Sequence, residues 1–179
     1  MRKNRRTAIL ISSCGVAFIV FIWALGKSGF RVNTTNSLPV GIYRVIPFLH
    51  HESFAAFCLP ESIGRLSMER GYRPRGTCPD GGAPFLKRVV AVTGDRVFLS
   101  GSGIAVNGEL LPKTAPRVQD RSGRPLQPWA FGNYVVSPDE LWVASTYNQY
   151  SYDSRYFGPI RSASVLYSLK SVLTVSAPE

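Results

Sequence analysis

The feature that most restricts the fold of this chain is an uncharged run near its N-terminus. Residues Ala8–Leu25 form an 18-residue stretch that contains no charged side chain. At a rise of about 1.5 Å per residue, a helix of this length reaches roughly 27 Å, close to the hydrocarbon thickness of a bilayer. We therefore expect residues 8–25 to form a transmembrane helix, separate from the rest of the chain.

Charged residues on either side of this run predict its orientation. Four basic side chains occur within residues 2–6, whereas Lys27 and Arg31 follow the run. Because the more basic flank tends to stay in the cytoplasm, residues 1–7 are expected to form a cytoplasmic basic tail, with the body outside. The same pattern also describes a secretory signal segment that is removed after export, and this alternative stays open.

The body of the chain shows the pattern of many short strands. Its 16 Gly and 13 Pro favour turns over a helical bundle. Residues 61–83 and 112–128 have the composition of long loops, the first with one helical turn near residues 62–70. Strands are expected at residues 40–48, 54–59, 85–92, 96–99, 104–106, 110–111, 134–136, 141–144, 165–167 and 172–175, with a hairpin turn at Asn107-Gly108. This spacing predicts an all-β (mainly β) body.

Composition and motifs disfavour several functions. The net charge is +10, but no basic run is interleaved with aromatic residues, so no nucleic acid is expected as a partner. The sequence contains no HExxH, Gly-x-Ser-x-Gly, P-loop or GxGxxG motif, and no metal or cofactor is expected. His50 and His51 are adjacent, and adjacent strand residues point to opposite faces, so a Ser-His-Asp triad has no local support.

The three cysteines divide into one in the apolar run and two in the body. Cys14 lies inside the run and is expected to be a small packing residue. Cys58 and Cys78 are twenty residues apart and belong to no CxxC or Cys/His cluster, which argues against a zinc site. In an exported body they could form a disulfide, and two free thiols are the alternative.

A lysine in the strand over residues 85–92 is the first candidate for catalysis. Lys87 alternates with Phe85, Val89 and Ala91, so it shares an apolar face and is either buried or at a sheet rim. Burial disfavours the ammonium form, and a neutral lysine can act as the base that a serine nucleophile needs. The alternative is an edge lysine whose head reaches solvent. Arg88 points the other way and is expected to form an ion pair.

Three segments together resemble the signal peptidase I superfamily of Ser/Lys peptidases. Residues 33–43 read Asn-Thr-Thr-Asn-Ser-Leu-Pro-Val-Gly-Ile-Tyr, residues 87–95 read Lys-Arg-Val-Val-Ala-Val-Thr-Gly-Asp, and residues 151–160 read Ser-Tyr-Asp-Ser-Arg-Tyr-Phe-Gly-Pro-Ile. The Ser-x-Pro-x-Gly-x-Tyr and Asp-Ser-Arg-Tyr-Phe-Gly-Pro forms are similar to its conjugative-transfer branch, the TraF peptidases. Thr93 departs from the pattern, because a proline often precedes Gly-Asp in the superfamily.

The resemblance implies a site and a fold. Ser37 matches the nucleophile, Lys87 the general base, Asp153 the required acidic residue and Thr35 a hydroxyl donor of the oxyanion hole. Whether Asp153 pairs with an arginine or orients Lys87 or Ser37 stays open. The matching residues with an expected supporting role are Arg88, Gly94, Asp95, Ser154 and Arg155. Residues 28–179 are expected to form a signal-peptidase-like catalytic domain.

The resemblance also implies a function and partners. It predicts a membrane-anchored serine endopeptidase of the bacterial inner membrane, with its catalytic domain in the periplasm. Its expected partners are the conjugative pilin precursor, the inner membrane and the conjugation secretion machinery. Hydrolysis and cyclisation of the pilin share one acyl-enzyme, so both remain open. The alternatives are a non-catalytic component of a conjugation or secretion assembly, and a general signal peptidase I.

Overall fold

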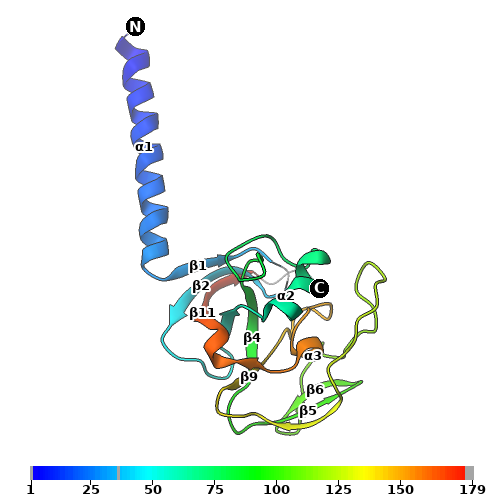
Figure 1. Ribbon diagram of the computed structural model, residues 1–179. Coiled ribbons are helices and arrows are strands. Elements are labelled where there is room, and N and C mark those ends of the chain that lie inside the picture. Colours follow the sequence, from blue (N-terminus) through cyan, green and yellow to red (C-terminus); the bar gives the residue numbers. More distant parts are fainter. Residues whose placement is uncertain (1, 36, 176–179) are drawn as a thin grey trace.

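A long helix extends away from a body built of strands in the computed structural model (Figure 1). The structure describes residues 2–35 and 37–175, and no side chain is described for residues 2–11, 13, 21 and 25. Helix α1 spans Arg2–Lys27 and makes its main contact with strand β1. The side chains of the expected basic tail, and Met1, lie outside the described residues. Within the part of the chain that is described, no helix is long and apolar enough to cross a membrane.

The body is organised around a seven-stranded sheet with the order β1-β2-β11-β3-β4-β9-β10. All of its neighbouring strands are antiparallel. The strands are β1 (Phe30–Asn33), β2 (Val40–Ile46), β11 (Val165–Val175), β3 (Phe54–Phe57), β4 (Phe85–Ala91), β9 (Glu140–Ala144) and β10 (Ile160–Arg161). The last strand, β11, joins the β1–β2 hairpin to β3 and β4, so segments far apart in the sequence become neighbours.

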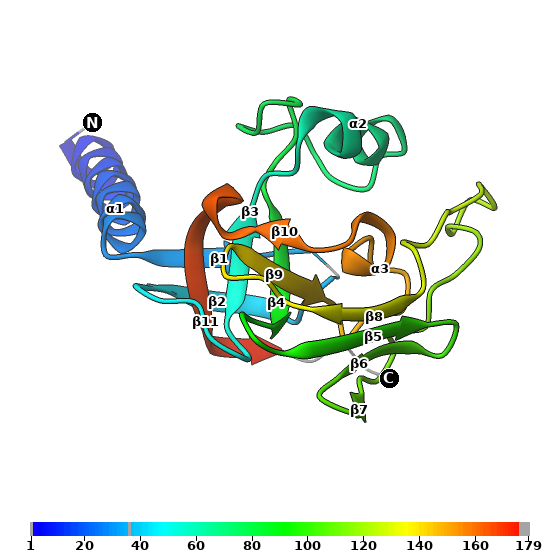
Figure 2. The same cartoon turned by 60° about the horizontal axis from the view of Figure 1, so that its bottom comes forward.

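A second sheet of four strands has the order β7-β6-β5-β8. These strands are β7 (Glu109–Leu110), β6 (Gly103–Val106), β5 (Arg96–Ser100) and β8 (Gly132–Val135). Asn107 and Gly108 have positive φ angles of 51° and 92°, as the predicted Asn-Gly hairpin between β6 and β7 requires. Figure 2 shows this sheet and helix α2 (Glu61–Glu69) at opposite sides of the body.

Two hydrophobic clusters hold the sheets together. One packs aromatic side chains from β3, β4 and the 152–157 segment, among them Phe57, Phe85 and Phe157. The other is formed by the small sheet and by Trp142 of β9. Because β4 and β9 contribute to both clusters, the strand that carries Lys87 lies at the centre of the body.

The predicted mainly β architecture is confirmed, with several differences in detail. Helix α2 has nine residues where one helical turn was expected. Strands β1 and β10 and helix α3 (Ser154–Phe157) were not predicted, and β11 is continuous where two strands were expected. Cys58 and Cys78 are joined by a disulfide, which ties the end of β3 to the segment after α2.

Candidate active site

Ser37 and Lys87 line the same cleft, which has a volume of about 680 Å³. Its wall also includes β1, the start of β4 and parts of the loops at residues 70–74, 120–126 and 148–152. We refer to it as the Ser37 cleft. A second, more apolar cavity of about 500 Å³ adjoins it and shares part of its wall.

One buried asparagine organises the loop that carries Ser37. Asn33 is only 4% exposed, and its Oδ1 accepts hydrogen bonds from the Thr35 backbone N–H at 3.1 Å and the Thr35 hydroxyl at 2.7 Å. Its Nδ2 donates to the carbonyls of Thr35, Leu38 and Pro39 at 3.1–3.3 Å. The Tyr43 hydroxyl donates to the Pro39 carbonyl at 2.7 Å. The side-chain amide of Asn33 thus makes five hydrogen bonds that hold the loop in place, each contributing about 1 kcal/mol.

The Ser37 side chain is half-buried, and its backbone is held from across the sheet. Its Oγ lies 3.4 Å from Thr35 Oγ1, so the predicted nucleophile and the predicted oxyanion donor are neighbours. Its carbonyl accepts a 2.6 Å hydrogen bond from the hydroxyl of Ser145, which follows β9. The same Ser145 oxygen accepts the backbone N–H groups of Tyr147 and Asn148.

Lys87 is buried, which is one of the two positions that the alternation of its strand allows. The residue is only 5% exposed. Its ammonium group makes no hydrogen bond or ion pair with any described residue. Burial lowers the pKa of Lys87 to about 8; nearby Asp153 acts to raise this pKa, and Arg155 acts to lower it. A lysine with this pKa is partly neutral near physiological pH, as a general base must be.

Asp153 forms a buried ion pair with Arg155, and both side chains are 0% exposed. Arg155 Nε donates to Oδ1 and Nη2 to Oδ2, each at 2.8 Å, which is a bidentate arrangement. Oδ2 also accepts the backbone N–H of Ser145 at 3.0 Å. Asp153 is thus connected through Ser145 to the backbone of Ser37, and it caps helix α3 by accepting the Arg155 N–H.

Comparison with known proteins decides the family of this chain. The family model described as signal peptidase, peptidase S26, matches residues 5–173. The chain belongs to the peptidase S26 family. A plasmid transfer protein TraF from Escherichia coli is 35% identical over 175 residues, which cover 97% of this chain and 98% of that protein. A probable conjugal transfer protein TraF from Sinorhizobium fredii (strain NBRC 101917 / NGR234) is 34% identical over 177 residues, covering 97% and 92%.

Membership of the S26 family confirms the resemblance predicted from the three sequence segments. The family match spans the segments that hold Ser37, Lys87 and Asp153. A crystal structure of a signal peptidase I from Enterococcus faecalis V583 gives a TM-score of 0.37 at 20% identity, covering 72% of this chain and 99% of that chain.

Two residues of the site in this S26 chain were not predicted from the sequence. Ser145 lies 108 residues from Ser37, and only the folded sheet brings them together. Ser151 also lines the Ser37 cleft, and its buried Oγ has no hydrogen-bond partner among the described residues. Ser151 is the first residue of the Ser-x-Asp-Ser-Arg segment, and this segment was the one sequence signal that could have pointed to Ser151 as a site residue.

The expected supporting residues stabilise the surroundings rather than the cleft wall. Arg88 Nη2 lies 2.9 Å from Glu52 Oε1, which is the ion pair predicted for its strand face. Gly94 has a φ of 88° in the turn after β4, and Asp95 Oδ2 accepts the Val92 N–H at 2.7 Å. Ser154 Oγ accepts the backbone N–H of Val143 at 3.0 Å, which ties α3 to β9.

The described part of the chain offers no cluster of three or more His, Cys, Asp and Glu that could hold a metal ion. The two histidines lie away from the Ser37 cleft. His51 Nε2 is 3.1 Å from Asp95 Oδ2, at the turn after β4. What the cleft brings together is a serine, a buried lysine and several hydroxyl groups, a set suited to acyl transfer.

Proposed function

We propose that this protein is a serine endopeptidase in which Ser37 is the nucleophile and Lys87 is the general base. The observation that carries the proposal is the burial of Lys87, with its pKa near 8, in the cleft that Ser37 also lines. Neutral Lys87 takes the proton of the Ser37 hydroxyl as Oγ bonds to the scissile carbonyl carbon. The resulting ammonium then gives its proton to the leaving amine, and an acyl-enzyme remains.

The oxyanion of the tetrahedral intermediate needs two donors, and we assign them to the Ser37 backbone N–H and the Thr35 hydroxyl. In the free protein the Thr35 hydroxyl donates to Asn33 Oδ1. Rotation about its χ1 angle would redirect this donor to the oxyanion. No hydrogen bond joins Ser37 to Lys87 in the described chain, and such bonds often tighten only when substrate is bound.

The edge position of β1 supports binding of an extended peptide. In the described part of the chain β1 pairs with β2 alone, and its residues Arg31, Val32 and Asn33 line the Ser37 cleft. A substrate segment that adds to this free edge receives backbone hydrogen bonds and is carried past Ser37.

We further propose that α1 anchors the protein in the bacterial inner membrane, with the peptidase domain in the periplasm. The proposal is supported by the uncharged run at residues 8–25 and by the exposed apolar side chains of α1. Phe18, Ile19 and Trp23 are each more than 60% exposed, which is unfavourable for a helix in water. Lys27 stacks over the Trp23 ring at 5.6 Å, an arrangement suited to a membrane interface.

We propose the conjugative pilin precursor as the substrate. The relatives are named as plasmid or conjugal transfer proteins, which supports a substrate that takes part in conjugation. The acyl-enzyme formed by Ser37 can be resolved by water, which gives a linear pilin. It can also be resolved by the N-terminal amine of the pilin, which gives a cyclic product.

Mass spectrometry of pilin from cells tests this proposal. Cells would carry the wild type, Ser37→Ala, Lys87→Met or the controls Ser102→Ala and Lys170→Ala, which change an exposed serine and an exposed lysine outside the cleft. We expect trimmed pilin with the wild type and both controls, and unprocessed precursor with the two site variants. A trimmed product that has also lost one water indicates cyclisation.

Other outcomes favour the two alternatives. Normal pilin from both site variants would contradict the Ser/Lys pair and favour a non-catalytic assembly component. Processing of ordinary exported precursors in a strain depleted of its own signal peptidase would favour a general signal peptidase I.

A further inference from the structure

The wall of the Ser37 cleft carries more cations than anions. Six basic side chains line the cleft, and Asp120 supplies the one carboxylate of its described wall. The basic residues are Arg31, Arg70, Arg73, Lys87, Arg121 and Arg124. Because a cleft lined by charges of one sign concentrates ligands of the opposite sign, this wall favours an anionic segment of substrate.

Three of these cations are engaged by carboxylates of the protein. Arg124 Nε lies 2.7 Å from Asp120 Oδ2, and Arg70 Nη1 lies 3.8 Å from the same oxygen. Arg73 forms an ion pair with Asp80, and both side chains are nearly fully buried. These pairs fix the loops of the cleft wall, and because Arg70 and Arg124 share Asp120, they leave one net positive charge among the three arginines.

Arg121 is held in a different way. Its guanidinium carbon lies 4.6 Å from the centre of the Tyr150 ring, and that of Arg117 lies 4.5 Å from the same centre. Neither arginine has an acidic partner within 4 Å among the described residues. Arg117 donates one long hydrogen bond of 3.5 Å to Gln149. We name these three residues the Arg117–Tyr150–Arg121 cluster.

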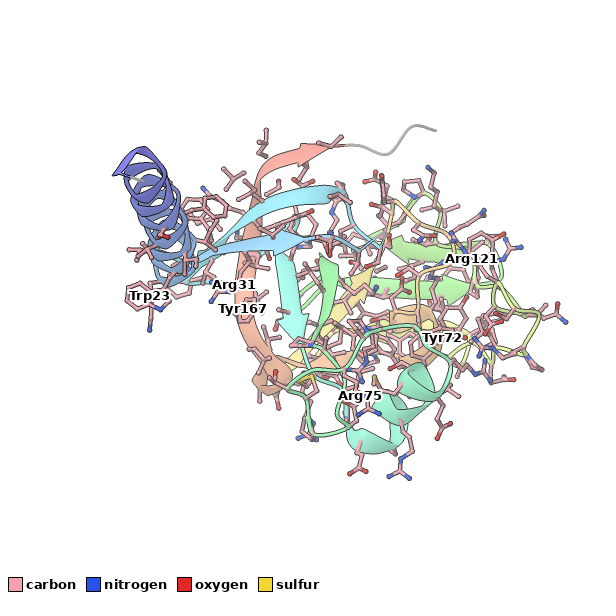
Figure 3. The ribbon with its side chains drawn as sticks, turned by 90° about the horizontal axis from the view of Figure 1, so that it is seen from above. Trp23, Arg31, Tyr72, Arg75, Arg121 and Tyr167 are labelled. Atoms are coloured by element: carbon pink, nitrogen blue, oxygen red, sulfur yellow. A yellow bond between two sulfur atoms is a disulfide. The ribbon has the colours of Figure 1, made fainter. Side chains whose placement is uncertain are left out.

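The cluster lies at the rim of the Ser37 cleft. Arg121 and Tyr150 both line the cleft, and Tyr150 is 39% exposed. Figure 3 shows Arg121 on the opposite side of the body from Arg31 and Tyr167. Arg31 lies close to α1, and its guanidinium donates to two backbone carbonyls. Arg121 is therefore the cleft arginine most available to a ligand.

We propose that the Arg117–Tyr150–Arg121 cluster binds a carboxylate of the peptide substrate, so that the enzyme selects acidic peptides. The carboxylate can belong to a Glu or Asp side chain or to a free C-terminus. This inference rests on the proposed function, because it assumes that a peptide occupies the Ser37 cleft.

The chemistry of the cluster suits this role. A guanidinium presents a planar fork of N–H donors that matches a carboxylate, and stacking on an aromatic ring holds the fork in place. Two guanidinium groups on one ring also repel each other, and a bound carboxylate relieves that repulsion. Because the cluster is partly exposed, the preference is modest, about three- to tenfold in kcat/KM.

An anionic lipid headgroup has the same charge, but the position of the cluster favours the peptide. The cluster lies across the body from Arg31, which is next to α1, the element that we place in the membrane (Figure 3). A cation that served the membrane surface would be expected near the end of α1, where Lys27 and Arg31 are found.

Peptide hydrolysis by the purified full chain in detergent tests the proposal. The probes are quenched fluorescent peptides that contain the scissile sequence mapped on the pilin, with Glu, Gln or Lys placed in turn at each of three positions on either side. A second set compares a C-terminal acid with its amide. The enzymes are the wild type, the Arg117→Gln/Arg121→Gln double variant and the control Arg161→Gln, an exposed arginine on β10.

We expect Glu to exceed Gln by three- to tenfold in kcat/KM at one position or more, or the terminal acid to exceed the amide by as much. We expect Lys to be the poorest residue, and the preference to weaken as salt rises from 50 to 500 mM. The double variant should lose the preference, and the control should keep it. An acid–amide difference alone identifies the terminal carboxylate as the ligand.

Equal rates for Glu, Gln and Lys in the wild type, together with equal rates for the C-terminal acid and its amide, would overturn this inference while leaving the peptidase intact. So would a preference that survives in the double variant. If the double variant loses binding to vesicles containing phosphatidylglycerol but keeps its peptide preference, the cluster serves the membrane. Cleavage by Ser37→Ala at the wild-type rate would instead contradict the proposed function. Binding of the Glu and Gln peptides to Ser37→Ala, followed by fluorescence anisotropy, tests the cluster without catalysis.

Discussion

At the scale of single residues, the burial of Lys87 combines a cost in stability with a gain in reactivity. Its pKa of about 8, against an ordinary value of 10.5, corresponds to a cost on the order of 3 kcal/mol for keeping the protonated form in the fold. At pH 7 roughly a tenth of such a lysine is neutral, compared with roughly 0.03% of an ordinary one. In the proposed mechanism, this cost in stability provides a usable base in the Ser37 cleft.

Replacing this lysine by an apolar residue should stabilise the protein. We expect Lys87→Met to raise the free energy of unfolding at pH 7 by about 1–3 kcal/mol, because it removes a desolvated charge. In the wild type the unfolded state binds more protons between pH 8 and 10.5, so stability should rise with pH in that window. Lys87→Met should lack this rise. Denaturant unfolding at several pH values measures this rise in stability, with Lys170→Met as the control. The same dependence of stability on pH in the wild type and in Lys87→Met would contradict the burial of Lys87.

The sequence predicts some of these residues and not others. The apolar neighbours Phe85, Val89 and Ala91 place Lys87 on an apolar face, because strand alternation is a local rule, but they leave open whether it is buried or at a sheet rim. The link from Asp153 through Ser145 to Ser37 depends on contacts between distant segments, so no local pattern reveals it.

At the scale of elements, the loop between β1 and β2 depends on contacts from β9. Removing the Ser145 hydroxyl removes its hydrogen bond to the Ser37 carbonyl and the bonds that it accepts from two backbone N–H groups. We expect Ser145→Ala to lower kcat by about tenfold and to destabilise the protein by about 1–3 kcal/mol. Ser145→Thr keeps the hydroxyl and should recover most of the activity. A kcat unchanged in Ser145→Ala would show that this contact does not position the nucleophile.

The disulfide should stabilise the element that forms one wall of the cleft. Cys58 and Cys78 close a 20-residue separation that contains α2 and the cleft-lining residues near Tyr72. We expect the Cys58→Ser/Cys78→Ser variant to lose about 2–4 kcal/mol of stability, because the unfolded chain gains freedom. Thermal melts of this variant and of Cys14→Ser, which should match the wild type, measure the effect. Equal melting temperatures would contradict a stabilising bridge.

Local signals predicted the long strands and the Asn107–Gly108 turn, but short elements escaped them. Helix α3 has four residues, and its side chains bond distant segments through Arg155 to the Lys113 carbonyl and through Ser154 to the Val143 N–H, so its stability comes from tertiary contacts. Strand β11 crosses residues 168–171, where the apolar alternation fails. Its pairing with β2 on one side and β3 on the other keeps the strand continuous.

At the scale of the whole molecule, we propose separate roles for α1 and the body. The main contact of α1 is with β1, so residues 28–179 should fold without it. We expect a chain of residues 28–179, exported with a cleavable signal, to appear in the soluble periplasmic fraction. It should hydrolyse short peptides within about twofold of the wild-type rate, whereas processing of membrane-bound pilin should fall at least about tenfold. Retention in the membrane fraction, or undiminished pilin processing, would contradict the anchoring role.

The arrangement of the large sheet explains how three distant segments form one site. Strand β11 places the β1–β2 hairpin next to β3 and β4, while β9 brings in Ser145 and the Asp153 segment.

The central claim is that neutral Lys87 activates Ser37. The most direct test is the pH dependence of kcat/KM for an uncharged peptide, because this quantity reports the ionisation of groups in the free enzyme. We predict a rise to a plateau with an apparent pKa near 8, unchanged in Arg161→Gln and absent in Lys87→Met. A rise centred near 6.5, the ordinary value of a histidine, or full activity in Lys87→Met, would contradict the account.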